Sequence, residues 1–213
     1  ARHAVLAGAD MVVELPSVFA VASAEDFAFG GVACANALNA DYLVFGSECG
    51  DVDKLQSVAD KLSDDEVNRR IKSLMEQGLP YPKAVATAVQ SDVLDSPNNV
   101  LAVEYIRAIT RSGSKITPLT IARENNYNDL TTANFASSSA IRADETLLER
   151  YSFPFVAKDF STIAEQRYKS FLPIVLSLFA AQDYEQVCGV SEGIENRFVA
   201  ADKSQGYDVM MDQ

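Results

Sequence analysis

The chain has 213 residues and a formal net charge of −12 at pH 7. Its composition is 48% hydrophobic and 23% charged, typical of a globular protein with one core and a small appendix. The acidic balance argues against strong binding to nucleic acid or to anionic membranes by this segment alone, because such binding needs clustered Lys and Arg. No apolar run reaches the ~18 residues of a membrane helix. Three scattered cysteines without metal-ligand spacing favour reduced thiols in a cytoplasmic protein.

The first forty residues alternate between helical and strand patterns. Residues 1–8 are typical of the end of a helix that stops at a glycine. The β-branched run 11–15, closed by a proline, predicts a buried parallel strand. Ser23, followed by two acids, predicts the N-cap of a helix that runs to about residue 39. The Gly30-Gly31 pair inside that helix lowers helix propensity, so we expect a close packing partner there.

The middle of the chain continues the alternation. The apolar run 42–45, ended by a glycine, predicts a second strand. Residues 51–77 carry a helical pattern with apolar positions on one side, and the Ser-Asp-Asp-Glu segment 63–66 predicts a capping box that divides it. A short helix is expected over 82–90.

The last part contains further helices and one strand. A helix is expected to open at Ser-Pro-Asn-Asn 96–99 and to close at Gly113, and residues 116–122 predict a third strand. Residues 124–136 are polar and turn-rich, and a helix is expected over 140–151. The remainder, 152–213, is expected to be helical.

This order of strands and helices predicts an α/β protein with an incomplete Rossmann-like parallel sheet and helices on both faces. Residues 1–150 would form this domain, and residues 151–213 a helical C-terminal region. Three strands are few for such a sheet, and the chain begins with Ala1 rather than Met. We therefore expect it to be a fragment, with its first strands upstream.

Ligands of doubly wound sheets bind at the carboxyl ends of the strands, which draws attention to two places. Gly46 follows a buried strand and would allow close approach of a ligand to the backbone, although a plain turn explains it as well. Arg123 and Glu124 follow the third strand, where a charged pair suits nucleotide contact, but an ordinary surface ion pair has the same appearance.

A third place is the run Ser137, Ser138, Ser139 followed by Arg142. Hydroxyls and free N–H groups at a helix start, with an arginine one turn inside, indicate a phosphate site. A simple N-cap would explain one of these serines. Asn98, beside Asn99, is either a helix cap or a side-chain amide that contacts adenine.

Other chemistry finds little support. His3 is the one histidine of the chain, so no Ser-His-Asp arrangement is expected. We name no metal ligand.

Several segments, taken in chain order, resemble one family. The chain is similar to the tRNA(Met) cytidine acetate ligases, which are nucleotidyltransferase-like enzymes. No segment alone is specific for this family, but seven such segments in the same order as in the family are. They are ADMVVELP (9–16), SAEDFAFGGV (23–32), FGSE (45–48), SPNNVLAVEY (96–105), PLTIAR (118–123), SSSAIR (137–142) and EGIENR (192–197).

The resemblance implies a reaction and its participants. Such enzymes use ATP, expected with Mg²⁺, to activate acetate as acetyl-adenylate, and then acetylate N4 of the wobble cytidine of elongator tRNA(Met). By the same resemblance Gly46, Asn98 and Arg123, with Glu124 alongside, would contact ATP. The serines and Arg142 would hold the phosphates, with Ser139 at the position of the family's threonine. Catalytic residues are expected upstream of Ala1.

The sequence also departs from the family. The histidine motif of its first strand and its C-terminal basic segment are absent here, so we expect this chain alone to be inactive. The sheet face left by missing strands would be hydrophobic, and a second copy covering it would make a homo-oligomer. Two alternatives stay open, namely a small-molecule adenylyltransferase and a non-catalytic nucleotidyltransferase-like binding module.

Overall fold

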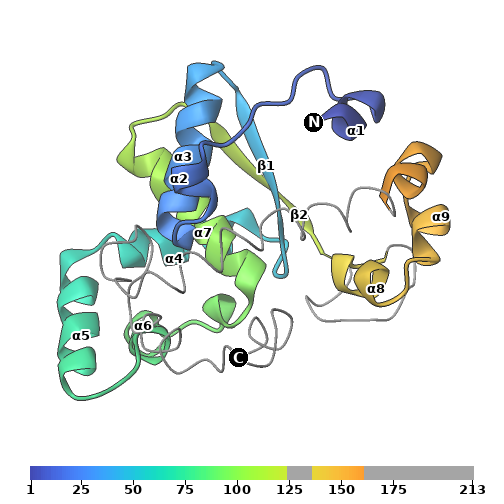
Figure 1. Ribbon diagram of the computed structural model, residues 1–213. Helices are drawn as coiled ribbons and strands as arrows, with labels where there is room; N and C mark the ends of the chain where they lie inside the picture. The colour runs from blue at the N-terminus through green and yellow to red at the C-terminus, as the bar shows by residue number, and fades with distance from the viewer. Residues whose placement is uncertain (124–135, 161–213) are drawn as a thin grey trace, which may run out of the picture. The chain divides into compact units, whose positions relative to one another are not determined.

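A computed structural model of the protein describes residues 1–123 and 136–160, without the side chains of Pro82 and Arg142 (Figure 1). The chain divides into two compact units, residues 1–147 and 148–213, which are considered separately. The assignment of nucleotidyltransferase-like and helical character to domains 1–150 and 151–213 stays a prediction. Among the described residues no helix is both long and apolar enough to span a membrane.

The centre of the first unit is a parallel pair of strands, β1 (Tyr42–Ser47) and β2 (Thr117–Ala122). Their register runs from Tyr42 opposite Thr117 to Ser47 opposite Ala122. Parallel strands need a long crossover, and the helices between residues 52 and 111 provide it. The predicted α/β class with a parallel sheet is confirmed.

The two faces of this sheet differ in exposure. Phe45 and Ser47 are buried beneath the helices, whereas the alternate side chains lie open. The exposed ones are Tyr42 (61%), Val44 (55%), Leu119 (43%) and Ile121 (64%). Among the described residues this face is thus apolar and exposed, as expected, whereas helices between residues 52 and 111 pack on the strands from the other side. That missing strands left this face open stays a prediction.

The covered face carries the core. The helices α3 (Ala24–Ala37) and α7 (Pro97–Arg111) pack along each other beside β1 (Figure 1). The helix α4 (Val52–Leu62) packs on α7 and on the strands. One apolar cluster includes residues of β1, α4 and α7, with the Phe45 and Tyr105 rings stacked 5.6 Å apart, and a second lies between α3 and α7.

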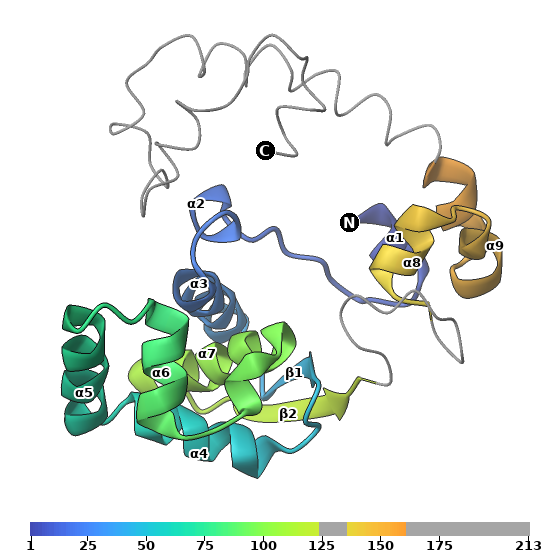
Figure 2. The same ribbon diagram turned by 90° about the horizontal axis from the view of Figure 1, so that it is seen from below.

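Two further helices extend this core away from the sheet. The helix α5 (Asp65–Glu76) packs against α6 (Tyr81–Val89), and both lie beyond α4 (Figure 2). A short 3₁₀ turn, η1 (Val93–Asp95), then leads into α7. The remaining short helices are α1 (Arg2–Leu6), α2 (Ser17–Ala20), α8 (Ser138–Ala143) and α9 (Leu147–Tyr151).

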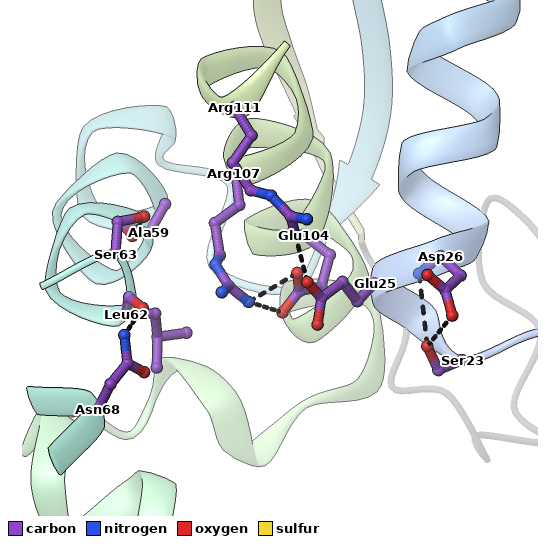
Figure 3. A network of polar contacts seen from close by, with 10 residues as sticks. All are labelled: Ser23, Glu25, Asp26, Ala59, Leu62, Ser63, Asn68, Glu104, Arg107 and Arg111. Carbon is purple, nitrogen blue, oxygen red and sulfur yellow. Dashed lines mark hydrogen bonds and ion pairs between the residues drawn. The ribbon is translucent and has the colours of Figure 1, made fainter. Parts of the chain in front are cut away.

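Ion pairs tie α7 to α3 and stiffen α7 itself (Figure 3). Arg111 of α7 pairs with Glu25 in the first turn of α3, and both side chains are about half exposed, so the pair is worth ~1 kcal/mol at most. Arg107 pairs with Glu104 at 2.7 Å, and both are largely buried. Burial raises the pKa of the Glu104 carboxyl more than Arg107 lowers it.

The glycine pair in α3 has the packing partner that the sequence predicts. A Cβ on Gly30 would lie 2.4 Å from Cγ of Phe19, so the Phe19 ring occupies the space that a side chain would fill. Gly31 has no such contact, since its nearest neighbour would be Tyr105 at 3.5 Å. The close packing therefore depends on Gly30.

One predicted strand is wrong. Residues 11–15 form no strand, and Met11, Val12 and Val13 are 66%, 41% and 49% exposed. A β-branched run becomes a strand only where its backbone pairs with a neighbouring strand, and residues 11–15 pair with neither β1 nor β2.

Two helix boundaries also differ from the prediction. The N-cap of α5 is Asp64, which accepts from the N–H groups of Glu66 and Val67, whereas the hydroxyl of Ser63 donates back to the carbonyl of Ala59. The predicted capping box is therefore wrong. The helix expected over 140–151 is divided in two, because Asp144 has an extended backbone.

Candidate functional site

The carboxyl ends of the two strands bring Gly46 and Arg123 together. The N–H of Arg123 donates to the carbonyl of Ser47 at 2.9 Å, which continues the ladder one residue beyond β2. A Cβ on Gly46 would lie 3.5 Å from Cγ of Arg123, so the arginine stem lies directly beside the glycine. By the alternation of the strands, both are on the uncovered face.

The turn after β1 is fixed by Ser47, whose side chain is fully buried. Its Oγ lies 2.7 Å from Oγ1 of Thr120 and accepts from the N–H of Gly50 at 3.0 Å. Because Thr120 donates to the carbonyl of Phe45, Ser47 donates to Thr120. The segment that follows Gly46 is thus held to both strands.

Glu48 joins this turn to the beginning of α7. Its Oε2 accepts from the N–H of Asn99 at 2.9 Å, and its Oε1 accepts from the N–H of Asn98 at 3.3 Å. These are the N–H groups that a helix N-cap normally satisfies, and Ser96 at the N-cap position makes no such side-chain bond. A residue from another element therefore caps α7.

The side chains of the two asparagines take different roles. Oε1 of Glu48 also accepts from Nδ2 of Asn98 at 2.6 Å. The Oδ1 of Asn99 accepts from the N–H groups of Glu48 and Cys49, at 2.9 and 3.1 Å. Asn99 is 4% exposed and serves the structure, whereas Asn98 is half-buried and lies nearer to solvent.

The environment of Glu48 keeps it ionised. Burial acts to raise its pKa, but the hydrogen bond from the Asn98 amide and those from backbone N–H groups outweigh burial, and the pKa is lowered from 4.5. A fixed negative charge thus lies at the strand end that carries Gly46.

The serine segment is described by its local geometry. Ser137 is buried and is the N-cap of α8, where its Oγ accepts from the N–H of Ala140 at 3.0 Å. Ser138 is exposed and Ser139 half-buried. Glu124 and the side chain of Arg142 lie outside the described residues, as does the connection 124–135. The predicted phosphate site stays a prediction.

Sequence reasoning assigned no role to Glu48 and considered Asn99 only with Asn98, as a helix cap or an amide that contacts adenine. Both residues belong to segments that the resemblance rests on, 45–48 and 96–105, but their partners are 50 and 51 residues away in the chain. No local signal indicates an outside acceptor, because Ser96 is an ordinary N-cap residue and only the structure shows that its side chain makes no capping bond.

Comparison with known proteins identifies the family of the chain. The sequence model described as HIGH Nucleotidyl Transferase matches residues 1–213. The chain belongs to the HIGH nucleotidyl transferase family. Two curated relatives of this nucleotidyl transferase chain are named tRNA(Met) cytidine acetate ligase. The one from Caldicellulosiruptor bescii is 37% identical over 92% of this chain and 54% of its own length. The one from Acetivibrio thermocellus is 36% identical over 99% and 59%.

Solved structures give the same result. The apo crystal structure of Thermotoga maritima TmcAL covers the whole nucleotidyl transferase chain with a TM-score of 0.81 and 30% identity, over 57% of TmcAL. The form bound with alpha-thio ATP has a TM-score of 0.77, also at 30% identity, over 56% of that protein. The chain thus spans between half and two thirds of the length of the relatives it matches.

Proposed function

We propose that the protein is an ATP-dependent ligase that acetylates N4 of the wobble cytidine of elongator tRNA(Met). An acetate oxygen would attack the α-phosphorus of ATP, forming acetyl-adenylate and releasing pyrophosphate. The N4 amine of cytidine would then attack the acetyl carbonyl, and AMP would leave. The names of the relatives and the ATP analogue bound by Thermotoga maritima TmcAL support this proposal.

The observation that carries the proposal is the meeting of Gly46, Arg123 and the beginning of α7 at one edge of the sheet. This is the edge where α/β sheets bind nucleotides. Gly46 would let the nucleotide approach the backbone, and Arg123 would pair with a phosphate oxygen. Asn98 would contact the nucleoside, and Glu124 would assist from beside Arg123.

The phosphates would extend to Ser137, Ser138, Ser139 and Arg142. Donors held in fixed positions would stabilise the charge that develops on the phosphates during adenylyl transfer. Mg²⁺ would arrive with ATP as part of the substrate, because it is usually bound by substrate phosphates together with one or two carboxylates. A tRNA-modifying enzyme of this kind would act in the cytoplasm.

The test is a calorimetric titration of the complete natural protein with Mg-ATP. Arg123→Ala is expected to weaken binding roughly tenfold to a hundredfold, the loss of one charge-assisted contact. The matched control is Arg70→Ala, which removes an exposed arginine of α5 and should leave affinity unchanged. Equal affinity of wild type and the Arg123 variant would contradict the proposed role.

The reaction is tested separately from binding. Release of pyrophosphate that requires acetate, followed by transfer of labelled acetyl to tRNA(Met), is the expected result. Pyrophosphate release with another carboxylate or a phosphate compound, and none with acetate, would instead indicate a small-molecule adenylyltransferase. ATP binding without any turnover would indicate a non-catalytic binding module.

A further inference from the structure

The amide orientation of Asn98 is fixed by Glu48. Nδ2 lies 2.6 Å from Oε1 of a carboxylate whose pKa is lowered, so this carboxylate can only accept. The opposite orientation of the amide would place two oxygens at that distance, which is repulsive. One of the two N–H groups of the Asn98 amide is therefore committed to Glu48, and the position of Oδ1 is fixed with it.

The other end of the same amide is an acceptor. Oδ1 of Asn98 has no hydrogen-bond partner among the residues that the structure describes, and the side chain is half-buried rather than enclosed. A ligand that reaches this amide thus meets an oxygen acceptor in a fixed position, and the carboxylate of Glu48 lies on the nitrogen side of the same amide. Both repel phosphate and favour a group that donates a hydrogen bond.

From these contacts we infer that Glu48 is a positioning residue that turns Asn98 into an acceptor for a donor on the nucleoside part of the bound nucleotide. Two nucleoside groups have this chemistry, the 6-amino group of adenine and a ribose hydroxyl. The inference rests on the proposed ATP site. It adds that the Glu48–Asn98 pair favours nucleosides that carry this donor over those that lack it. The pair also favours the orientation in which the phosphates of the nucleotide lie toward Arg123.

The strand and helix ends make this arrangement stiff. The carboxylate of Glu48 is held by the N–H of Asn99, and the backbone of Glu48 is held in turn by the side chain of Asn99. An acceptor that cannot rotate does not adapt to a ligand without the donor, so a missing donor costs affinity instead of being compensated.

The experiment compares nucleotide affinities of the complete natural protein by calorimetry. The probes are ATP, purine riboside triphosphate (which lacks the 6-amino group), 2′-deoxy-ATP and 3′-deoxy-ATP. Wild type is expected to bind one of the three analogues about tenfold or more weakly than ATP. A loss with purine riboside triphosphate identifies the amine as the donor, and a loss with a deoxy analogue identifies the hydroxyl.

Two variants then test the pair. Asn98→Ala removes the acceptor, and Glu48→Gln introduces an amide N–H donor, which lets Asn98 turn its amide. Both should bring the analogue-to-ATP affinity ratio to about one, and the double variant should bring no further change. Glu76→Gln on the exposed end of α5 is the control.

The ratio of analogue affinity to ATP affinity distinguishes a loss of Asn98 positioning from a general loss of protein stability. A loss of stability would weaken the binding of all four nucleotides together and leave the ratio unchanged. Glu48→Gln with a wild-type ratio would overturn the inference, and so would a wild type that binds all four equally. Absence of ATP binding by wild type is a different result, because it overturns the proposed function itself.

Discussion

Glu48, directly after β1, and Asn99, in the first turn of α7, form two reciprocal hydrogen bonds. The carboxylate of Glu48 accepts from the N–H of Asn99, and Oδ1 of Asn99 accepts from the N–H of Glu48. The result resembles a capping box in which the two halves come from different parts of the chain. It fixes the end of β1 to the beginning of α7. The residues that would contact a nucleotide, Gly46 and Asn98, are therefore held at a constant separation.

Asn99→Ala tests the strength of this connection. The N–H groups of Glu48 and Cys49 would lose their common acceptor in a partly buried place, and we expect the free energy of unfolding to fall by about 2–3 kcal/mol. Urea unfolding of the complete protein measures it. Asn68→Ala is the control, since this exposed side chain makes a single bond to the carbonyl of Leu62, and its loss should cost about 1 kcal/mol or less. Equal losses in both variants would contradict the role of Asn99.

The lowered pKa of Glu48 predicts a pH dependence of stability. A carboxyl with a pKa below 4.5 in the folded state stabilises the fold above pH 4.5, and this contribution disappears as the pH falls through the folded-state pKa. Glu48→Gln should therefore reduce the free energy of unfolding at pH 7, and the difference from wild type should shrink below pH 4.5. Urea unfolding between about pH 3 and about pH 7, a range that spans the ionisation of an ordinary carboxyl, measures it.

Glu104→Gln provides the contrast, because burial raises the pKa of Glu104. Its charge costs stability, so wild type should lose stability relative to this variant as the pH rises from 4.5 through the folded-state pKa. The two variants thus have opposite slopes with pH. Parallel slopes would contradict the predicted direction of the pKa shift for at least one of the two carboxyls.

Much of this fold is local enough to be predicted from sequence. The run at 42–45 is apolar and is closed by a glycine, the run at 116–122 is mostly apolar, and both became strands. The helix after Ser23 began where its N-cap and acidic first turn indicated, and the capping contact lies within three residues of the signal. The two strands, in contrast, depend on pairing with each other across the chain, but their composition was enough to identify them.

The failures involve partners distant in the chain or absent from the described residues. The run 11–15 has strand composition, but a strand also needs a neighbour, and composition carries no information on whether one is present. The contact of Glu48 with Asn98 spans 50 residues and depends on how α7 crosses the strand end. Gly46 and Arg123 were predicted separately, and only the parallel register places them together.

Gly30 and Gly31 give a matched pair for the packing of α2 on α3. A Cβ on Gly30 would meet Phe19 at 2.4 Å, so Gly30→Ala must displace that ring and should cost about 1–3 kcal/mol. Gly31→Ala meets only ordinary contact and gains helix propensity, so it should stabilise by roughly 0.5–1 kcal/mol. Thermal unfolding midpoints that move in opposite directions are expected. A shift of the same sign in both would mean that Phe19 does not occupy this place in solution.

Gly46→Ala separates a binding role of this glycine from a structural one. Its backbone is not left-handed, and a Cβ would lie at an ordinary 3.5 Å from Arg123, so neither strain nor collision requires glycine here. Alanine should leave the fold as stable or more stable by up to about 1 kcal/mol, since glycine weakens a strand. If the nucleotide approaches this backbone, the added methyl group should weaken Mg-ATP binding about tenfold or more.

Gly50→Ala is the control for the Gly46 variant, because here glycine is structurally required. Its φ is +59°, and a Cβ would lie 2.5 Å from Cβ of Ala122, so alanine should lower the free energy of unfolding by roughly 1–3 kcal/mol. The two variants are thus expected to differ in kind, one losing affinity at wild-type stability and the other losing stability. A Gly46→Ala protein with unchanged affinity would mean that the nucleotide does not contact β1 at Gly46, and the site would then have to be sought around Arg123 and the start of α7 alone.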